Sequence, residues 1–387
     1  NEGHAALLAA ALLREHPHPS DRPRDGALSY DADRVRERCI FTTHTPVEAG
    51  HDRFDYEKAG RLLSDFLPLD QMKLLAGPDR LNMTRLALNL SGYVNGVAIR
   101  HAETTRRMFP GYGIRAVTNG VHAPTWVHPA FALLFQGFAP DWGHDPEVLS
   151  GADQLSDNAV WSAHQAAKDE LLAEVQLLTG TAMRPDIPLL AFARRMTGYK
   201  RPDLLFTDIE RLRAISREQP FQLVIAGKAH PHDDGGKTLI AEIHAHIRAL
   251  AADIPIAFLP NYDMALAKKL VAGADVWLNT PLPPYEASGT SGMKAALNGV
   301  LNLSILDGWW IEAWVEGVTG WAIGHDDQRH EGDAQNLYDK LERTVLPLYY
   351  TDRARWLRMM KDSISKVGPR FNSQRMMRRY ASEAYLR

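Results

Sequence analysis

The chain has 387 residues, of which 45% are hydrophobic and 24% are charged, a composition typical of a folded globular protein large enough for two domains. Its formal net charge of −3 argues against nucleic acid or an anionic membrane as a partner. Cys39 is the only cysteine, which excludes an intramolecular disulfide, and no apolar run reaches the roughly 18 residues of a membrane span. We therefore expect a cytoplasmic protein that binds neither nucleic acid nor membrane.

The first third of the chain is expected to be mostly helical. Its predicted elements are a helix over 5–14, a strand over 39–42, a helix over 81–108 interrupted by two glycines, and an extended segment over 114–117. Because the sequence starts at Asn1 and enters the first helix directly, we expect a chain that begins inside a longer protein. Residues 1–120 are predicted to form an incomplete N-terminal domain.

From residue 187 onward, short apolar segments alternate with longer amphipathic ones, which predicts an α/β domain with a doubly wound parallel sheet over 121–387. The predicted strands are 188–193, 221–226, 254–259, 275–279 and 299–304. The predicted helices are 202–217, 236–252, 262–272 and 290–298. Polar clusters follow the strands, at the edge of the sheet where ligands bind in this architecture.

The most informative of these clusters is the segment 286–299, which reads EASGTSGMKAALNG. Its small residues allow the backbone to approach a ligand closely, and a helix that begins near Thr290 directs free amides toward an anion. Lys294 lies one turn inside that helix, where a Schiff-base cofactor with a phosphate group requires a lysine. The alternative is a tight strand-to-helix turn with Lys294 as a solvated surface amine.

A second cluster follows the first predicted strand of this domain. Arg194, Arg195, Lys200 and Arg201 lie within eight residues of one another. Four cations at the end of one strand indicate anion binding. The alternative is scattered surface charge in a connection between a strand and a helix.

Together these segments resemble the glycogen and starch phosphorylases. Residues 286–294 are similar to the cofactor-lysine segment of that family, and residues 194–200 are similar to its phosphate-binding segment. Further matches follow in order at 1–4, 43–45, 94–98, 118–120, 227–229, 261–262 and 306–308. The sequences of residues 194–200 and 307–310 resemble those of the shorter bacterial and archaeal α-glucan phosphorylases. The resemblance implies a GT-B type fold with a Rossmann-like C-terminal domain, whose final helix returns to the N-terminal domain.

The resemblance also implies a cofactor, pyridoxal 5′-phosphate, held on Lys294. The implied cofactor-binding residues are Lys294, Arg194, Thr290, Ser291, Tyr262 and Trp126. Arg195 and Lys200 are implied to bind the substrate phosphate and to form the catalytic set with Lys294. The implied residues for the transferred glucosyl unit are Glu286, Ser288, Gly289, Asn119 and His44.

The implied activity is that of a hexosyltransferase. Inorganic phosphate cleaves a terminal α-1,4-glucosyl unit from glycogen, starch or maltodextrin, and glucose 1-phosphate leaves with retention of configuration. The cofactor's phosphate serves as the acid and base, so no carboxylate pair need flank the bond. The partners expected from the resemblance are an α-glucan, inorganic phosphate, a second copy of the chain in a homodimer, and a missing N-terminal segment or companion chain.

Two other functions remain open from the sequence. A nucleotide-sugar glucan synthase of the same fold carries two glutamates eight positions apart in the equivalent turn, whereas here Glu286 is followed at that distance by Lys294. A catalytically inactive, truncated glucan-binding relative is the second alternative. No metal is predicted, because Pro46 interrupts the helix that His44, Glu48 and His51 would need to bind one.

Overall fold

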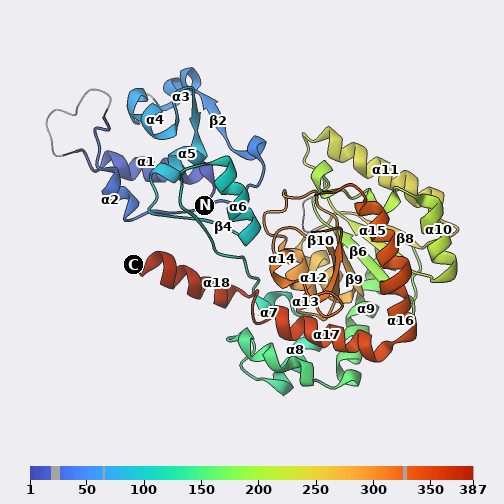
Figure 1. Cartoon of the computed structure of the whole chain (residues 1–387). Helices are drawn as coiled ribbons and strands as arrows, with labels where there is room; N and C mark the ends of the chain where they lie inside the picture. Colours follow the sequence, from blue (N-terminus) through green and yellow to red (C-terminus); the bar gives the residue numbers. More distant parts are fainter. Residues whose placement is uncertain (19–26, 64–65, 326–328, 387) are drawn as a thin grey trace. The chain divides into compact units, whose positions relative to one another are not determined.

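The computed structural model describes residues 1–18, 27–63, 66–325 and 329–386. The chain forms two compact units (Figure 1). The first unit comprises Asn1–Thr118 with Arg378–Arg387, and the second comprises Asn119–Met377. Among the described residues, no helix combines the length and apolar character needed to cross a bilayer.

The second unit contains a six-stranded parallel sheet in the order β11-β10-β9-β6-β7-β8. Its strands are β6 (Leu189–Ala193), β7 (Gln222–Ala226), β8 (Ile256–Leu259), β9 (Val276–Asn279), β10 (Leu301–Ile305) and β11 (Gly320–Ile323). Renumbered from β6, this is the strand order 3-2-1-4-5-6 of a Rossmann fold. The predicted α/β class, with a doubly wound parallel sheet of the GT-B type, is confirmed.

Both faces of this sheet are covered, which explains the continuous apolar runs in its strands. Successive residues of β6 point to opposite faces, so that Leu190 and Phe192 join one hydrophobic cluster while Leu189 and Ala191 join another. All five residues of β6 are buried.

Helices fill the connections of the second unit (Figure 1). They are α7 (Ala123–Trp126), α8 (Pro129–Phe138), α9 (Asp157–Thr179), α10 (Ile209–Glu218), α11 (Asp234–Leu250), α12 (Met264–Gly273), α13 (Thr290–Ala296), α14 (Trp310–Ala313), α15 (Asp333–Lys340), α16 (Leu346–Thr351) and α17 (Arg353–Val367). The last helix, α18 (Ser373–Tyr380), begins in the second unit, and its final residues belong to the first. The helix predicted over 202–217 begins only at Ile209, because the Asp208 carboxylate accepts the backbone N–H of Arg211, 3.0 Å away, and so caps it.

A buried ionic cluster joins α9 to the amino ends of β6 and β9. The Nζ of Lys168 lies 2.6 Å from Oδ2 of Asp275, and Nε2 of His164 lies 2.9 Å from Oδ1. All three side chains are fully buried. Oδ2 of Asp275 also accepts the backbone N–H of Leu189, at 2.7 Å. One carboxylate therefore contacts a helix and the beginnings of two neighbouring strands.

The first unit contains a three-stranded parallel sheet in the order β1-β4-β5, and a two-stranded antiparallel sheet, β2-β3. The strands are β1 (Ile40–Thr42), β2 (Arg53–Asp55), β3 (Arg80–Asn82), β4 (Tyr93–Gly96) and β5 (Ile114–Ala116). The helices are α1 (Ala6–Arg14), α2 (Ala32–Arg36), α3 (Tyr56–Leu63), α4 (Leu69–Ala76), α5 (Met83–Asn89) and α6 (Ile99–Met108). Tyr380, from the C-terminal segment of this unit, accepts a hydrogen bond at its hydroxyl from Nδ2 of Asn95, 2.9 Å away.

The prediction of one interrupted helix over 81–108 is wrong. The segment contains α5, the central strand β4 and α6. All four residues of β4 are buried, and the strand pairs with β1 on one side and β5 on the other. A fully buried strand lacks the alternation of polar and apolar residues that marks a half-buried strand, so the sequence does not reveal it.

Candidate functional site

Most of the predicted site residues follow β6 and β9, the two strands at which the strand order of the large sheet reverses. β6 and β9 are hydrogen-bonded neighbours, with Leu190 opposite Val276. The connections that leave them diverge, and ligands bind in the crevice that forms at such a point. A backbone hydrogen bond of 2.7 Å from Leu282 to the carbonyl of Tyr199 joins the two connections.

Two predicted site residues, Arg194 and Lys200, contact the carboxylate of a third, Glu286. Glu286 Oε2 accepts hydrogen bonds from Nη2 of Arg194 and from Nζ of Lys200, the latter at 2.6 Å. Glu286 is only 8% exposed. Burial alone raises the pKa of Glu286, but the charges of Arg194 and Lys200 outweigh burial and lower it. The carboxylate is therefore ionised, and it neutralises one of two adjacent positive charges.

The pKa of Lys200 is lowered to about 8. Burial is the largest cause, the positive charge of Arg194 adds to it, and the attraction of Glu286 offsets part of the effect. The ammonium also lies 4.6 Å from the centre of the Tyr199 ring. At neutral pH Lys200 is thus still a cation, but one that loses its proton far more easily than a lysine in water.

Arg194 has hydrogen-bonding capacity that the protein does not use. Its Nε and Nη1 atoms are buried and have no hydrogen-bond partner among the described residues. Buried donors of a charged group are costly when they lack an acceptor, so this guanidinium fits an anion. Tyr262 is close by, since burial raises its pKa and the charge of Arg194 opposes part of that rise.

Lys294 projects from α13 onto an aromatic ring. Its Nζ lies 3.7 Å from the centre of the Trp126 ring, and burial lowers its pKa. Among the described residues no carboxylate forms an ion pair with this amine. A lowered pKa increases the fraction of neutral amine, which is the form that attacks an aldehyde. Lys294 is therefore partly buried, and its role as the cofactor lysine stays a prediction.

Asn298 positions Lys294 and Trp126, and the sequence did not point to it. Its Nδ2 donates to the carbonyl oxygens of both residues, each at 2.9 Å, and its Oδ1 accepts the backbone N–H of His128 at 2.8 Å. The side chain is fully buried. The only signal in the sequence is the spacing of four residues between Lys294 and Asn298, which places both on one side of a helix.

Asp307 is the second residue without a predicted role, although its segment contributed to the family resemblance. Its Oδ2 accepts the backbone N–H of Glu286 at 2.8 Å, and its Oδ1 accepts that of Gly308 at 2.9 Å. Asp307 is 2% exposed and follows β10. It therefore holds the backbone of Glu286 in place from a third strand.

The turn before α13 is tightly packed. Gly289 has φ of +87°, and a Cβ there would lie 3.2 Å from the Trp309 ring. Ser288 Oγ is buried and has no hydrogen-bond partner among the described residues, while Ser291 Oγ accepts from Nε1 of Trp277 at 3.1 Å. The hydroxyl of Ser288 is thus available to a ligand, whereas that of Ser291 is engaged in packing. The assignment of Thr290 to cofactor binding stays a prediction.

Three other predicted residues make no recorded hydrogen bond to Glu286, Arg194 or Lys200 within the described residues. Arg195 is exposed, and its charge reaches Tyr199, where it opposes the rise in pKa that burial causes. The carbonyl of Asn119 accepts from Nη2 of Arg375 at 3.0 Å. His44 belongs to the first unit, where its Nε2 lies 2.7 Å from Oδ1 of Asn1. Their assigned roles stay predictions.

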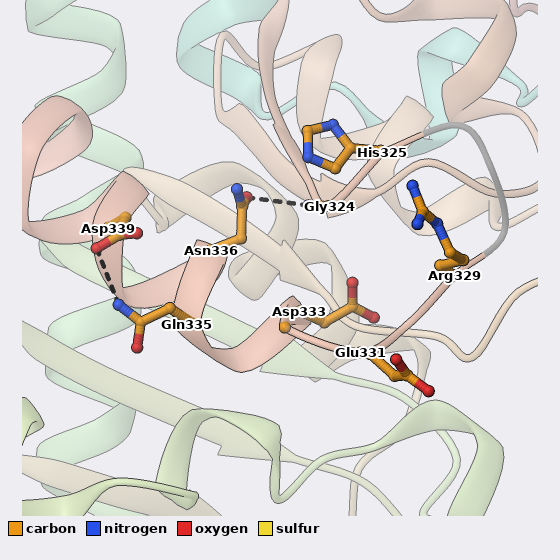
Figure 2. A pocket seen from close by; sticks show the side chains of 9 residues that line it. Gly324, His325, Arg329, Glu331, Asp333, Gln335, Asn336 and Asp339 are labelled. Carbon is orange, nitrogen blue, oxygen red and sulfur yellow. Dashed lines mark hydrogen bonds between the residues drawn. The ribbon is translucent and has the colours of Figure 1, made fainter.

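A cavity of about 340 Å³ lies elsewhere in the second unit (Figure 2). Its lining residues are Gly324, His325, Arg329, Glu331, Gly332, Asp333, Gln335, Asn336 and Asp339. None of the predicted site residues lines it. Side chains on its wall bond to their neighbours, as Gln335 does to Asp339. Across the described parts of the chain, no cluster of three or more His, Cys, Asp or Glu side chains could hold a metal ion.

Comparison with known proteins agrees with the resemblance seen in the sequence. The family model described as carbohydrate phosphorylase matches residues 47–326, more than half of the chain. The chain is 39% identical to the maltodextrin phosphorylase of Thermococcus litoralis over 388 aligned residues, which cover 91% of this chain and 47% of that protein. It is 37% identical to the glycogen phosphorylase of Mycobacterium tuberculosis, covering 100% of this chain and 50% of that protein.

The glycogen phosphorylase of Aquifex aeolicus is 38% identical, with 91% of this chain and 57% of that protein aligned. The chain thus spans about half the length of the curated relatives it matches. The matched region includes every segment that meets at the switch point of the large sheet, from Trp126 to Asp307. The chain belongs to the carbohydrate phosphorylase family.

Proposed function

We propose that this chain is the cofactor-binding part of an α-glucan phosphorylase, which uses inorganic phosphate to release glucose 1-phosphate from the end of an α-1,4-glucan with retention of configuration. The observation that carries the proposal is the pair of buried, unmatched nitrogens of Arg194 beside Lys200, at the switch point of a Rossmann-like sheet. Buried cations with donors to spare require anions, and family membership makes phosphate the natural choice.

Pyridoxal phosphate fits the residues around Lys294. The amine is half-buried, its pKa is lowered, and an aromatic ring covers it, so that it is prepared for covalent attachment to an aldehyde. Arg194 offers two unused donors to the cofactor phosphate, and the Tyr262 side chain lies within reach of that guanidinium's charge. When bound, pyridoxal phosphate supplies through its phosphate group the acid and base of a proton relay.

The residues of this chain would do the rest by positioning and charge. Lys200 and Arg195 hold the substrate phosphate, and their positive charges permit it to approach a second phosphate group closely. The buried hydroxyl of Ser288 and the carboxylate of Glu286 bind hydroxyls of the glucosyl unit. The closely packed Gly289 keeps the backbone of this turn against the sugar. The roles proposed for Asn119 and His44 rest on the family resemblance.

We also propose residues 1–120 and 121–387 as the domain organisation, supported by the division of the structure into units near residue 118. A homodimer, a companion or missing segment, and a cytoplasmic location stay predictions from the sequence. No structural observation favours a glucan synthase or an inactive binding protein.

The test is an assay of glucose 1-phosphate release from maltodextrin by the purified natural polypeptide, combined with borohydride reduction and peptide mapping of the cofactor. We expect the reduced cofactor on Lys294. Lys294→Ala should abolish both the label and the activity, while Arg195→Ala should chiefly raise the KM for phosphate.

Lys268→Ala, which removes an exposed lysine of α12, is the matched control and should behave like the unaltered protein. Full activity in Lys294→Ala, or a label on a different lysine, would refute the proposal.

A further inference from the structure

We propose that Glu286 couples the binding of the two substrates: its carboxylate occupies the phosphate-binding cations until sugar hydroxyls replace them as its partners. The inference rests on the proposed function and concerns the same site. It follows from one geometric fact, that a residue assigned to the sugar is hydrogen-bonded to two residues assigned to phosphate groups.

The first step of the argument concerns competition for donors. Arg194 and Lys200 both donate to the same carboxylate oxygen, Oε2 of Glu286. The cofactor phosphate needs such donors from Arg194, and the incoming substrate phosphate needs them from Lys200. With Glu286 in place the three side chains carry a net charge of +1, and without it the charge is +2. A phosphate group that binds here must therefore compete with an anion that is part of the protein.

The second step concerns the cost of displacing that anion. Glu286 is only 8% exposed, and its backbone N–H is fixed on Asp307, so its carboxylate has little access to water in this arrangement. If the cations turned toward phosphate alone, a buried carboxylate would lose both of its charged partners, which is strongly unfavourable. Phosphate by itself should bind weakly for this reason.

The third step is what the sugar changes. Neighbouring hydroxyls of a glucosyl unit can donate to both oxygens of one carboxylate. Within the described parts of the chain, the hydrogen bonds to the Glu286 carboxylate converge on Oε2, and the buried, unmatched hydroxyl of Ser288 lies two residues away in the sequence. Sugar donors would stabilise the carboxylate while Arg194 and Lys200 move to phosphate. Each substrate then raises the affinity for the other, as thermodynamic linkage requires.

The experiment measures binding rather than turnover. The Kd of inorganic phosphate for the cofactor-loaded protein is determined by calorimetry at neutral pH, with and without saturating glucose, a sugar that phosphate cannot cleave. For the unaltered protein we expect glucose to lower the Kd of phosphate about tenfold, within the usual range of coupling between sites. For Glu286→Gln we expect phosphate to bind about tenfold more tightly in the absence of sugar, and glucose to change that affinity little.

Asp333→Asn is the matched control. Asp333 forms an ion pair of 2.7 Å with Arg201, the residue after Lys200, so the variant removes the same charge from a neighbouring cation. We expect it to leave the phosphate affinity and its dependence on glucose unchanged. If both variants tightened phosphate binding equally, long-range charge would explain the result, and the coupling role of Glu286 would be refuted.

A second variant protects the test against misfolding of Glu286→Gln. Glu286→Asp keeps the charge but withdraws the carboxylate by one methylene, so phosphate should bind more tightly than to the unaltered protein and the effect of glucose should shrink. Equal or weaker phosphate binding by the variants would overturn the coupling while leaving the proposed function intact. A complete failure of the unaltered protein to bind phosphate, with or without glucose, would overturn both.

Discussion

The side-chain amine of Lys294 lies 3.7 Å from the centre of the indole ring of Trp126. The two residues come from different helices, and the side chain of Asn298 bonds to the backbone carbonyl of each. A cation is attracted to an aromatic face, yet burial disfavours the charged form. Burial lowers the pKa of Lys294, which increases the fraction of reactive neutral amine.

Replacement of Asn298 should therefore change the position of Lys294, although Lys294 itself is unaltered. Asn298→Ala removes two donors and one acceptor from buried backbone groups, so we expect a loss of roughly 2–4 kcal/mol in the free energy of unfolding. We also expect slower and less complete attachment of pyridoxal phosphate. Urea denaturation measures the first effect and absorbance of the bound cofactor the second. Asn298→Asp keeps the acceptor for His128 but loses both donors, so normal cofactor attachment in that variant would contradict the positioning role.

Anion binding should weaken as the pH rises through about 8. Burial lowers the pKa of Lys200 to about 8, so its side chain is a cation below that pH and neutral above it. Sulfate is the suitable probe, because its own charge does not change in this range. We expect a constant Kd for sulfate below pH 7.5 and an increase approaching tenfold per pH unit above 8.

Lys200→Arg is the control for this titration, since arginine stays charged throughout. Its sulfate affinity should show no transition near pH 8. A transition that persists in Lys200→Arg would assign the pH dependence to another group.

The first unit should lose stability under mild acid because of His101. Its imidazole is fully buried, its Nδ1 accepts the backbone N–H of Val97 at 3.2 Å, and burial lowers its pKa to about 4. The unfolded chain binds a proton below pH 6.5, whereas the folded chain does so only near pH 4. The free energy of unfolding should therefore fall by about 2 kcal/mol between pH 7 and pH 5 from this residue alone. His101→Gln should remove that part of the pH dependence, measured by urea denaturation.

The buried cluster around Asp275 should be sensitive to the loss of one partner. Burial by itself raises the pKa of Asp275, but the charge of Lys168 and the His164 contact outweigh burial and lower it to about 2. Lys168→Met would remove the ammonium partner of this buried carboxylate and leave it with His164 and the backbone N–H of Leu189, at a cost of about 3–5 kcal/mol in the free energy of unfolding. The double variant Lys168→Met, Asp275→Asn should recover part of that loss. A single variant as stable as the unaltered protein would contradict this account.

Strand positions in the second unit were predictable because parallel strands are short apolar runs followed by polar residues. All five predicted strands are present, with bounds that differ by at most two residues. The edge strand β11, Gly320–Ile323, was not predicted. It is short and begins with a glycine of φ +150°, so that its sequence resembles a turn more than a strand. The central strand β4 was mistaken for helix because it is buried throughout.

The residue types at the candidate site were predictable from the sequence, but the contacts between them were not. The sequence placed Arg194, Lys200 and Glu286 near one strand edge, but residue types alone could not show that the carboxylate bonds to both cations. Nor could they reveal Asn298, because its hydrogen bonds go to backbone atoms that any residue would offer. Contacts of this kind depend on how elements distant in the chain pack together.

The position of Asp275 has a consequence for the geometry of chemistry at the opposite side of the sheet. This one carboxylate touches the first residue of β6 and immediately precedes β9, and the far ends of these strands lead to Arg194 and to Glu286. A strand of five residues is about 16 Å long, so a small tilt at its pivot is magnified into a larger displacement at its tip. A substitution at Asp275 would therefore displace Arg194 and Glu286 from one another, although neither residue is itself changed.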